Sequence, residues 1–294
     1  MHEITINSEA CKKDGLCAAA CPRGILTQEE AGTVPKIVAT YLDKCFLCGH
    51  CVAICPHGAT THSDFPEGTV SSIKTETVPT YDQVLELIRS RRSRRLFKDA
   101  PVERGVIENV LEAARFAPSG HNEQTTEFVI VKDKEVLHRI GALTAAGLAN
   151  TARNTRNPIG RMMMRRALGR RGAAYVTEMA PELEGLVNLF RGGTDWILRD
   201  APALLLFCAD SAQGSFASIN ATLALHNATL AAETLGLGCF YVGFVVIVSE
   251  RDDRIARLLS LPETHKIYGA LAIGYPRLKY KKWPERNPAK ATWV

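Results

Sequence analysis

A cysteine repeat near the N-terminus constrains this chain more than any other feature. Seven of its nine cysteines fall between residues 11 and 55. Three of them recur 34 residues later, and a proline follows the last cysteine of each copy. The repeated positions are Cys11, Cys17 and Cys21 in the first copy and Cys45, Cys51 and Cys55 in the second. A repeat of thiols in so short a stretch indicates a metal-binding unit built twice.

The second copy has the bacterial spacing for a cubane iron–sulfur cluster, in which three cysteines lie two residues apart and the fourth precedes a proline. The fourth cysteine of such a run ligates the other cluster. The spacing therefore predicts one cluster on Cys45, Cys48, Cys51 and Cys21. It predicts a second cluster on Cys11, Cys17 and Cys55. A zinc ribbon would instead require two separate pairs of cysteines.

The first copy departs from the pattern at one position, where Asp14 stands in place of the second cysteine. A carboxylate is a harder ligand than a thiolate and holds iron less firmly. Three interpretations stay open: a four-iron cluster with Asp14 as a ligand, a three-iron cluster, and an Asp14 that only caps a turn.

Residues 1–65 resemble a bacterial two-cluster ferredoxin, a small α+β fold with short strands expected at residues 3–6 and 35–39. Residues 66–80 are interpreted as a linker, because the stretch Thr61–Pro79 is rich in Thr, Ser, Pro and Gly and lacks apolar periodicity.

Composition excludes several classes of protein. A disulfide scaffold needs a secretory context, and the N-terminal residues contain neither a basic start nor an apolar stretch, so we expect a cytoplasmic protein. The longest apolar runs are far shorter than the roughly 20 residues of a membrane span, so no membrane association is expected. A basic cluster between Arg89 and Lys98 lacks any accompanying nucleic-acid-binding motif, so no nucleic acid is expected.

The remainder, residues 81–294, mixes helical and strand patterns without a regular alternation, which favours an α+β domain with a mixed sheet flanked by helices. Helices are expected around residues 84–88 and 106–114 and over residues 221–235. Strands are expected at residues 128–131, 203–208, 239–248 and 267–273. The glycines Gly236 and Gly238 follow a helix and precede a strand, the reverse of the order in a dinucleotide-binding fold.

Four segments of this second domain resemble the nitroreductase family of FMN enzymes. They are Arg91-Arg92-Ser93-x-Arg95-x-Phe97, the run from Ala117 to Gln124, the run from Leu235 to Phe244, and Ile273-Gly274-Tyr275-Pro276 with a basic tail. Their order along the chain matches the family. Together with the ferredoxin-like head, the resemblance identifies a ferredoxin–nitroreductase fusion.

The resemblance implies a set of FMN-binding residues. Guanidinium and hydroxyl groups suit a phosphate, and a glycine permits close approach of the backbone to the ring. The implied residues are Arg91, Arg92, Ser93, Arg95, Pro118, Ser119, Asn122, Gln124, Val242, Gly243, Lys282 and Arg286. The family tail often carries Lys-x-Arg, whereas Pro284 stands at the lysine's place here.

The resemblance also implies the function. We expect an oxidoreductase that passes electrons from iron–sulfur clusters to FMN and on to a nitroaromatic, a quinone or a similar acceptor. Catalytic side chains are not expected, because the chemistry belongs to FMN. A homodimer and a reduced ferredoxin or other low-potential donor are the expected partners. The alternatives are an electron-transfer subunit that serves a partner protein, and a reductive dehalogenase or other flavin chemistry on the same fold.

A few further residues are weighed individually. Cys208 and Cys239 lie in apolar strands and are expected to be inert buried thiols. His57 is expected at the surface, with tuning of the second cluster as the alternative, and His121 is a candidate for substrate contact. The methionines at 162–164 lie among arginines in a stretch without a family anchor, which predicts either a covering helix or a mobile lid.

Overall fold

The computed structural model describes residues 2–294, which divide into two compact units. One unit comprises the described residues up to Pro79 together with Gly120–Glu123, and the other comprises Thr80–Ser119 and Gln124–Val294. Residues 66–80 are exposed throughout. Among the described residues, no helix is both long and apolar enough to cross a membrane.

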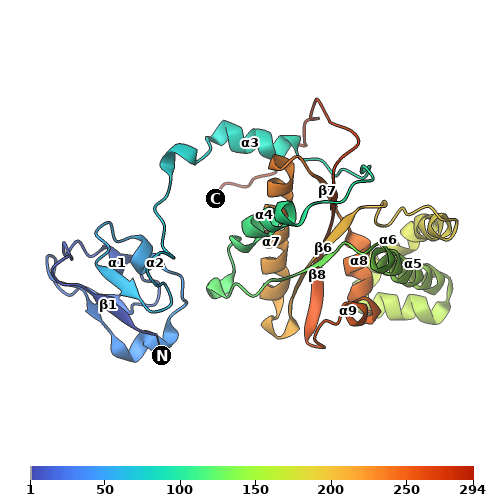
Figure 1. The fold of residues 1–294 in the computed structure, drawn as a ribbon. Helices are drawn as coiled ribbons and strands as arrows, with labels where there is room; N and C mark the ends of the chain where they lie inside the picture. The colour runs from blue at the N-terminus through green and yellow to red at the C-terminus, as the bar shows by residue number, and fades with distance from the viewer. Residues whose placement is uncertain (1) are drawn as a thin grey trace. The chain divides into compact units, whose positions relative to one another are not determined.

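The first unit is built from short strands and helices that follow the cysteine repeat (Figure 1). Strand β1 (Ile4–Ile6) pairs antiparallel with β4 (Thr60–His62), and β2 (Leu26–Thr27) pairs antiparallel with β3 (Lys36–Ile37). Helix α1 (Leu16–Ala20) and helix α2 (His50–Ala53) occupy equivalent places in the two copies. The 3-10 helices Ala39–Lys44 and Thr75–Thr77 complete the unit.

The backbone of the first unit repeats with the same 34-residue offset as the cysteines. Lys13 and Leu47 both have positive φ, at 62° and 50°. Gly15 and Gly49 precede the two helices with φ of 74° and 70°, a conformation that glycine adopts without steric cost. These left-handed residues curl each loop tightly between its first and third cysteines.

The second unit contains a four-stranded sheet in the order β5-β6-β8-β7. The strands are β5 (Glu127–Val131), β6 (Ala203–Asp210), β7 (Gly238–Tyr241) and β8 (His265–Gly274). The sequence predicts a mixed sheet. The four strands pair antiparallel, and a parallel element is present as an isolated bridge between Ser93 and Cys239.

Helices cover both faces of this sheet, so β6 is buried along nearly its whole length (Figure 1). Ala203, Leu205 and Phe207 pack in one core with α4 (Arg104–Arg115) and α7 (Ser215–Thr234). Leu204, Leu206 and Cys208 face the opposite core. That core also contains residues of α5 (Lys134–Arg156), α6 (Pro158–Arg191), α8 (Gly243–Ser249) and α9 (Arg254–Leu258). Alternation along one strand thus supplies both cores, which is the α+β architecture that the sequence predicts.

One predicted strand is wrong in its second half. Residues 239–248 are expected as a strand, but β7 ends at Tyr241 and α8 begins at Gly243. A continuous apolar run cannot distinguish a buried strand from a buried helix. As a helix, the run buries Val245, Val246 and Val248 in the core.

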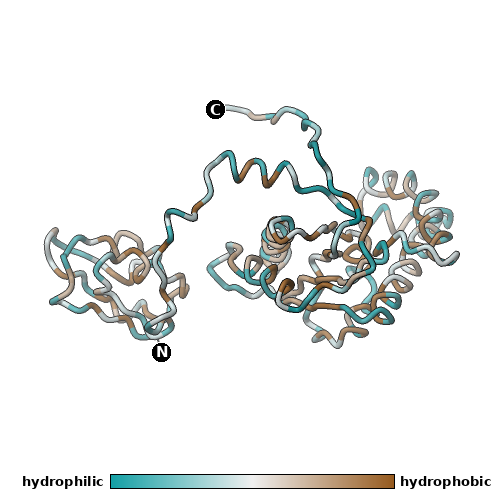
Figure 2. The backbone as a smooth tube through the Cα atoms, turned by 45° about the horizontal axis from the view of Figure 1, so that its top comes forward, coloured by the Kyte–Doolittle hydropathy of each residue, from teal (hydrophilic) through white to brown (hydrophobic). Residues whose placement is uncertain are grey.

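One helix belongs to neither core, and another is irregular within its length. Helix α3 (Tyr81–Ser90) begins with a capping box formed by Thr80 and Gln83, buries none of its residues and alternates hydrophobic with hydrophilic positions (Figure 2). Helix α6 has a non-helical Gly169 and contains Pro181. In α6, Met164 is buried whereas Met162 and Met163 are exposed, so these methionines lie on a helix that covers the core.

Candidate functional site

Four thiols of the first unit line a single small cavity. They are Cys21 from the first copy of the repeat and Cys45, Cys48 and Cys51 from the second. Burial raises the pKa of the Cys51 thiol to about 11 and also raises the pKa of Cys45. Thiolates at these positions therefore need a compensating cation, which is what a metal cluster supplies. The structure thus brings together the ligand set predicted for one cluster.

Backbone amides donate to the cysteine sulfurs at equivalent positions of both copies. The N–H of Lys13 donates to Cys11 Sγ and that of Leu47 to Cys45 Sγ, both at 3.4 Å. The N–H of Ile25 donates to Cys21 Sγ and that of Ala59 to Cys55 Sγ, both at 3.3 Å. Donors aimed at sulfur stabilise thiolate charge and tune an iron–sulfur cluster.

The remaining predicted ligands are Cys11, Cys17, Cys55 and Asp14. Cys17 is buried, and Cys11 and Cys55 are partly buried. Burial acts to raise the pKa of Cys55, but backbone amides of Thr60, His57 and Ala59 outweigh it, so the pKa is lowered. Asp14 is exposed, and its Oδ1 accepts a hydrogen bond from the N–H of Leu16 at 3.2 Å. That contact is the turn-capping interaction considered for Asp14. Iron binding by Asp14 stays a prediction.

No three His, Cys, Asp or Glu side chains of the described residues are placed to hold a single metal ion.

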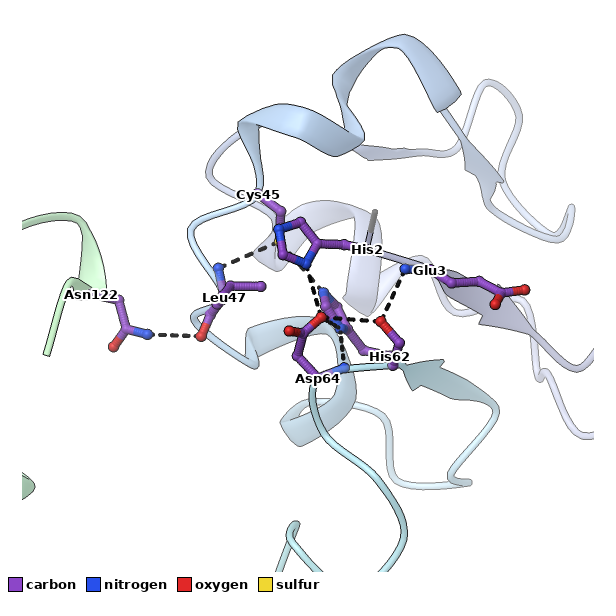
Figure 3. A network of polar contacts seen from close by, with 8 residues as sticks. His2, Glu3, Cys45, Leu47, His62, Asp64 and Asn122 are labelled. Atoms are coloured by element: carbon purple, nitrogen blue, oxygen red, sulfur yellow. Dashed lines mark hydrogen bonds and ion pairs between the residues drawn. The ribbon is translucent and has the colours of Figure 1, made fainter.

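His62 lies beside the four-thiol cavity and was not identified from the sequence. Its Nε2 is 3.5 Å from Cys45 Sγ, and its side chain is 1% exposed (Figure 3). Burial lowers the pKa of His62. The sequence instead singles out His57, which is exposed, as the surface placement predicts. Only the pairing of β4 with β1 brings His62 to Cys45, so spacing carried no signal for it.

Asn122 and His121 belong to the first unit. Asn122 Nδ2 donates to the carbonyl oxygen of Leu47 at 2.7 Å (Figure 3). The ring of His121 lies 4.9 Å from that of Phe46. The predicted role of Asn122 toward FMN and that of His121 toward substrate stay predictions.

In the second unit, three of the four family-like segments meet at one end of the sheet. The N–H of Arg94 donates to the carbonyl of Cys239 at 2.9 Å, beside the bridge from Ser93. The N–H of Lys98 donates to the carbonyl of Tyr275 at 2.8 Å. The first segment is thereby fixed against both β7 and the end of β8.

Arg94 forms an ion pair with Glu233 of α7, so its guanidinium has a partner within the second unit. Burial raises the pKa of Glu233, and the charges of Arg94 and Arg91 oppose that rise. Arg91 and Arg92 are partly buried, and Ser93 and Arg95 are exposed.

Arg95 lines a cavity together with Val242 and Gly243, and all three are predicted FMN residues. Trp196, Phe240 and Tyr241 contribute aromatic walls. Arg199 also lines this cavity; burial lowers its pKa, as does the charge of Arg95. Arg199 was missed because it lies in no motif, and only the fold brings it to Arg95. Two cations and aromatic walls suit a planar, anionic ligand.

The second segment lines a different cavity. Pro118, Ser119 and Gln124 line it together with Asn220 of α7. Within this segment, Ser119 Oγ accepts from the N–H of Gln124 at 3.0 Å. Within one chain, these residues therefore line a different cavity from Arg95 and Gly243.

The tail after β8 carries Lys282 and Arg286, both exposed. The guanidinium of Arg89 stacks over the ring of Trp283 at 4.4 Å, and that of Arg94 lies 5.7 Å from the ring of Tyr280. These cation–π contacts hold the tail beside the arginine segment.

Cys208 and Cys239 are 0% and 4% exposed, and burial raises the pKa of each thiol to about 12. Their prediction as buried thiols is confirmed.

Comparison with known proteins bears on both units. The model of the Nitroreductase family matches residues 88–275, and that of a 4Fe-4S dicluster domain matches residues 9–59. The second match covers the cysteine repeat, and the first covers three of the four family-like segments together with the start of the fourth.

Individual proteins show the same likeness. The chain is 26% identical over 231 residues to an FMN reductase [NAD(P)H] of Bacillus subtilis, which covers 71% of this chain and 72% of that protein. It is 39% identical over 80 residues to iodotyrosine deiodinase 1 of Sus scrofa, 27% of this chain and 25% of that protein. The crystal structure of a nitroreductase with bound FMN from Desulfitobacterium hafniense shares the fold, with a TM-score of 0.53 and 22% identity. That match covers 73% of this chain and all of the other.

Proposed function

This chain belongs to the nitroreductase family, and from that membership we propose that it is an FMN-dependent oxidoreductase whose iron–sulfur clusters supply electrons to FMN for the reduction of a small electrophilic acceptor. A nitroaromatic, a quinone or a similar conjugated compound is the proposed acceptor. A reduced ferredoxin or another low-potential protein is the proposed donor, and the cytoplasm is the proposed location.

The observation that carries this proposal is the cavity shared by Cys21, Cys45, Cys48 and Cys51. Four thiols in one cavity, two of which accept backbone N–H groups at sulfur, are the ligand set that a cubane cluster needs. Their origin in both copies of the repeat matches the exchange of the fourth cysteine between two clusters. Cys11, Cys17 and Cys55, with Asp14, are the proposed ligands of the other cluster.

The second unit offers residues that fit FMN. Bound FMN would supply hydride and single-electron chemistry. Arg95 and Arg199 would provide positive charge at its polar edge, and Gly243 would let the backbone approach the ring. The full set proposed from the family resemblance is Arg91, Arg92, Ser93, Arg95, Pro118, Ser119, Asn122, Gln124, Val242, Gly243, Lys282 and Arg286.

A homodimer is part of the proposal. The proposed FMN residues of one chain fall into separate groups, with Arg95 and Gly243 in one cavity and Pro118 and Ser119 in another. A cofactor bound between two copies would draw one group from each. Residues 66–80, exposed throughout, are proposed as a linker between the two domains.

Anaerobic purification with iron, sulfide and flavin quantitation tests the cofactors. Two clusters and one FMN per chain support the proposal. Colourless protein that contains zinc instead of iron would contradict it.

Stopped-flow spectroscopy tests the activity. Protein reduced by dithionite or ferredoxin is mixed with a nitroaromatic or a quinone, and rapid reoxidation of flavin is expected. Reoxidation by a partner protein alone would identify an electron-transfer subunit instead.

Reductive dehalogenation is a second candidate, favoured by the 39% identity to iodotyrosine deiodinase 1 over 80 residues. A halogenated aromatic in the same assay distinguishes the two. Halide release coupled to flavin reoxidation, faster than nitro reduction, would favour the dehalogenase.

A further inference from the structure

His62 stands at the end of β4, where its side chain is almost completely buried against the cavity of the four thiols. The ring of Phe65 meets it edge-on, with centroids 5.3 Å apart. Its Nε2 lies 3.5 Å from Cys45 Sγ, a hydrogen-bonding distance for sulfur (Figure 3). A buried imidazole must place both ring nitrogens against partners, because an unsatisfied polar atom in the interior is costly.

The partner of Nδ1 fixes the tautomer of this ring. The backbone N–H of Asp64 points at Nδ1 at 3.1 Å. A backbone N–H only donates, so Nδ1 accepts and the ring proton resides on Nε2. The ring therefore presents an N–H to Cys45.

The carboxylate of Asp64 is the competing partner of Nδ1, and it is farther away, at 3.4 Å. Asp64 Oδ2 also has other partners: Ser63 Oγ donates to it at 3.0 Å, and His2 Nδ1 lies 2.9 Å from it. Ser63 Oγ in turn accepts from the N–H of Glu3 at 3.1 Å. This network holds Asp64, and with it the N–H that orients His62 (Figure 3).

We propose that His62 is a positioning residue for the second-copy cluster, donating its Nε2–H to the Cys45 thiolate and thereby holding that cluster at a more positive reduction potential. The inference rests on the proposed ligation of a cluster by Cys45. Reduction adds negative charge to the cluster and its sulfurs, and a hydrogen-bond donor stabilises that charge more in the reduced than in the oxidised state.

The first copy of the repeat has no counterpart to this histidine. The residue 34 positions before His62 is Gln28, whose Nε2 donates to the carbonyls of Lys13 at 3.0 Å and Thr33 at 2.7 Å. Gln28 thus forms hydrogen bonds with backbone carbonyls of its loop, whereas His62 lies within hydrogen-bonding distance of a cysteine sulfur. The imidazole of His62 therefore gives the second copy a side-chain donor at a cysteine sulfur that Gln28 does not provide in the first copy.

The test is an EPR-monitored redox titration of the anaerobically purified full chain and its variants. His62→Phe keeps the ring but removes the donor, and one of the two cluster potentials is expected to fall by about 59 mV, a tenfold change in a one-electron equilibrium constant. His62→Gln keeps a side-chain N–H and is expected to restore most of the shift. His138→Phe is the control for loss of an imidazole, because His138 is exposed on α5 and does not line the four-thiol cavity, and it is expected to leave both potentials unchanged.

Labelling the histidines with ¹⁵N provides a second readout, which holds even if His62→Phe loses its iron. A histidine ¹⁵N coupling to the reduced cluster, absent in His62→Gln, supports the inference. A wild-type chain that lacks this coupling overturns it. So does a His62→Phe protein with wild-type iron content and unchanged potentials. Wild-type protein without any cluster signal would instead overturn the proposed function, and this inference with it.

Discussion

Asp14 is the side chain that most clearly distinguishes the two copies of the cysteine repeat. It occupies the position that Cys48 holds in the second copy, at the same 34-residue offset as the other ligands. Cys48 lines the four-thiol cavity, whereas Asp14 is exposed and accepts a hydrogen bond from Leu16 within its own loop. The two copies have similar backbone conformations, but at this position they offer iron ligands of different hardness.

Replacing Asp14 with cysteine should make the first copy equivalent to the second. Because thiolate binds iron more tenaciously than carboxylate, Asp14→Cys is expected to bring the chain to about eight iron atoms and to abolish any three-iron EPR signal. Iron quantitation and EPR after mild oxidation are the measurements.

The reciprocal substitution is the control. Cys48→Asp places the carboxylate in the second copy, and that cluster is expected to lose iron on oxidation. Equal iron retention in wild-type protein and in both variants would show that this position does not determine the stability of the clusters.

Cys208 and Cys239 permit a prediction based on pKa. Burial raises each thiol pKa to about 12, so the thiolate becomes abundant only as the pH approaches that value. Iodoacetamide at about pH 8 is expected to modify neither residue in folded protein and both after unfolding. Peptide mass mapping measures this, and rapid labelling of either thiol in the folded chain would contradict the burial.

Among the secondary-structure elements, α5 begins with a side-chain N-cap that a substitution can test. Asp133 precedes the helix, and its Oδ1 accepts a hydrogen bond from the N–H of Val136 at 2.9 Å. This N-cap satisfies one of the free amides of the first turn.

Asp133→Ala is expected to lower the free energy of unfolding of the second unit by about 1 kcal/mol. Denaturant titration followed by tryptophan fluorescence reports this unit, because Trp196, Trp283 and Trp293 all lie in it.

Asp253→Ala is the matched control for the cap. Asp253 also precedes a helix, α9, but makes no capping hydrogen bond and only an exposed ion pair with Arg257. Its effect is expected to stay within about 0.5 kcal/mol. Equal losses in the two variants would show that the Asp133 cap contributes nothing special.

On the scale of the whole molecule, the proposed homodimer gives a distinct prediction. Ile219 and Leu223 lie one turn apart on α7 and are 50% and 38% exposed. Ile219→Glu would place a charge on this apolar surface and is expected to yield monomers with reduced flavin content, because burying an unpaired charge is costly. Sedimentation velocity and flavin absorbance are the measurements.

Arg104→Glu on α4 serves as the control for added negative charge, since Arg104 is exposed and pairs with Glu108. It is expected to leave the sedimentation coefficient unchanged. An Ile219→Glu protein that remains dimeric with full flavin would remove α7 from the proposed interface.

The sequence alone determined the features that depend on covalent spacing. Cys45, Cys48 and Cys51 lie within one short segment, with two residues between each and the next, and the other copy of the repeat identifies Cys21 as the fourth thiol. The α+β class, the burial of Cys208 and Cys239 and the strands at residues 203–208 and 267–273 followed from hydrophobic patterning, which reports burial directly.

The tertiary structure alone decided what depends on contacts between distant segments. It turned the apolar run after Gly243 into a helix, because that run packs into a core which the local pattern does not describe. It brought Arg199 to Arg95 and His62 to Cys45. Each of these two proximities depends on chain segments that pack together through other residues, so no local spacing in the sequence encodes it.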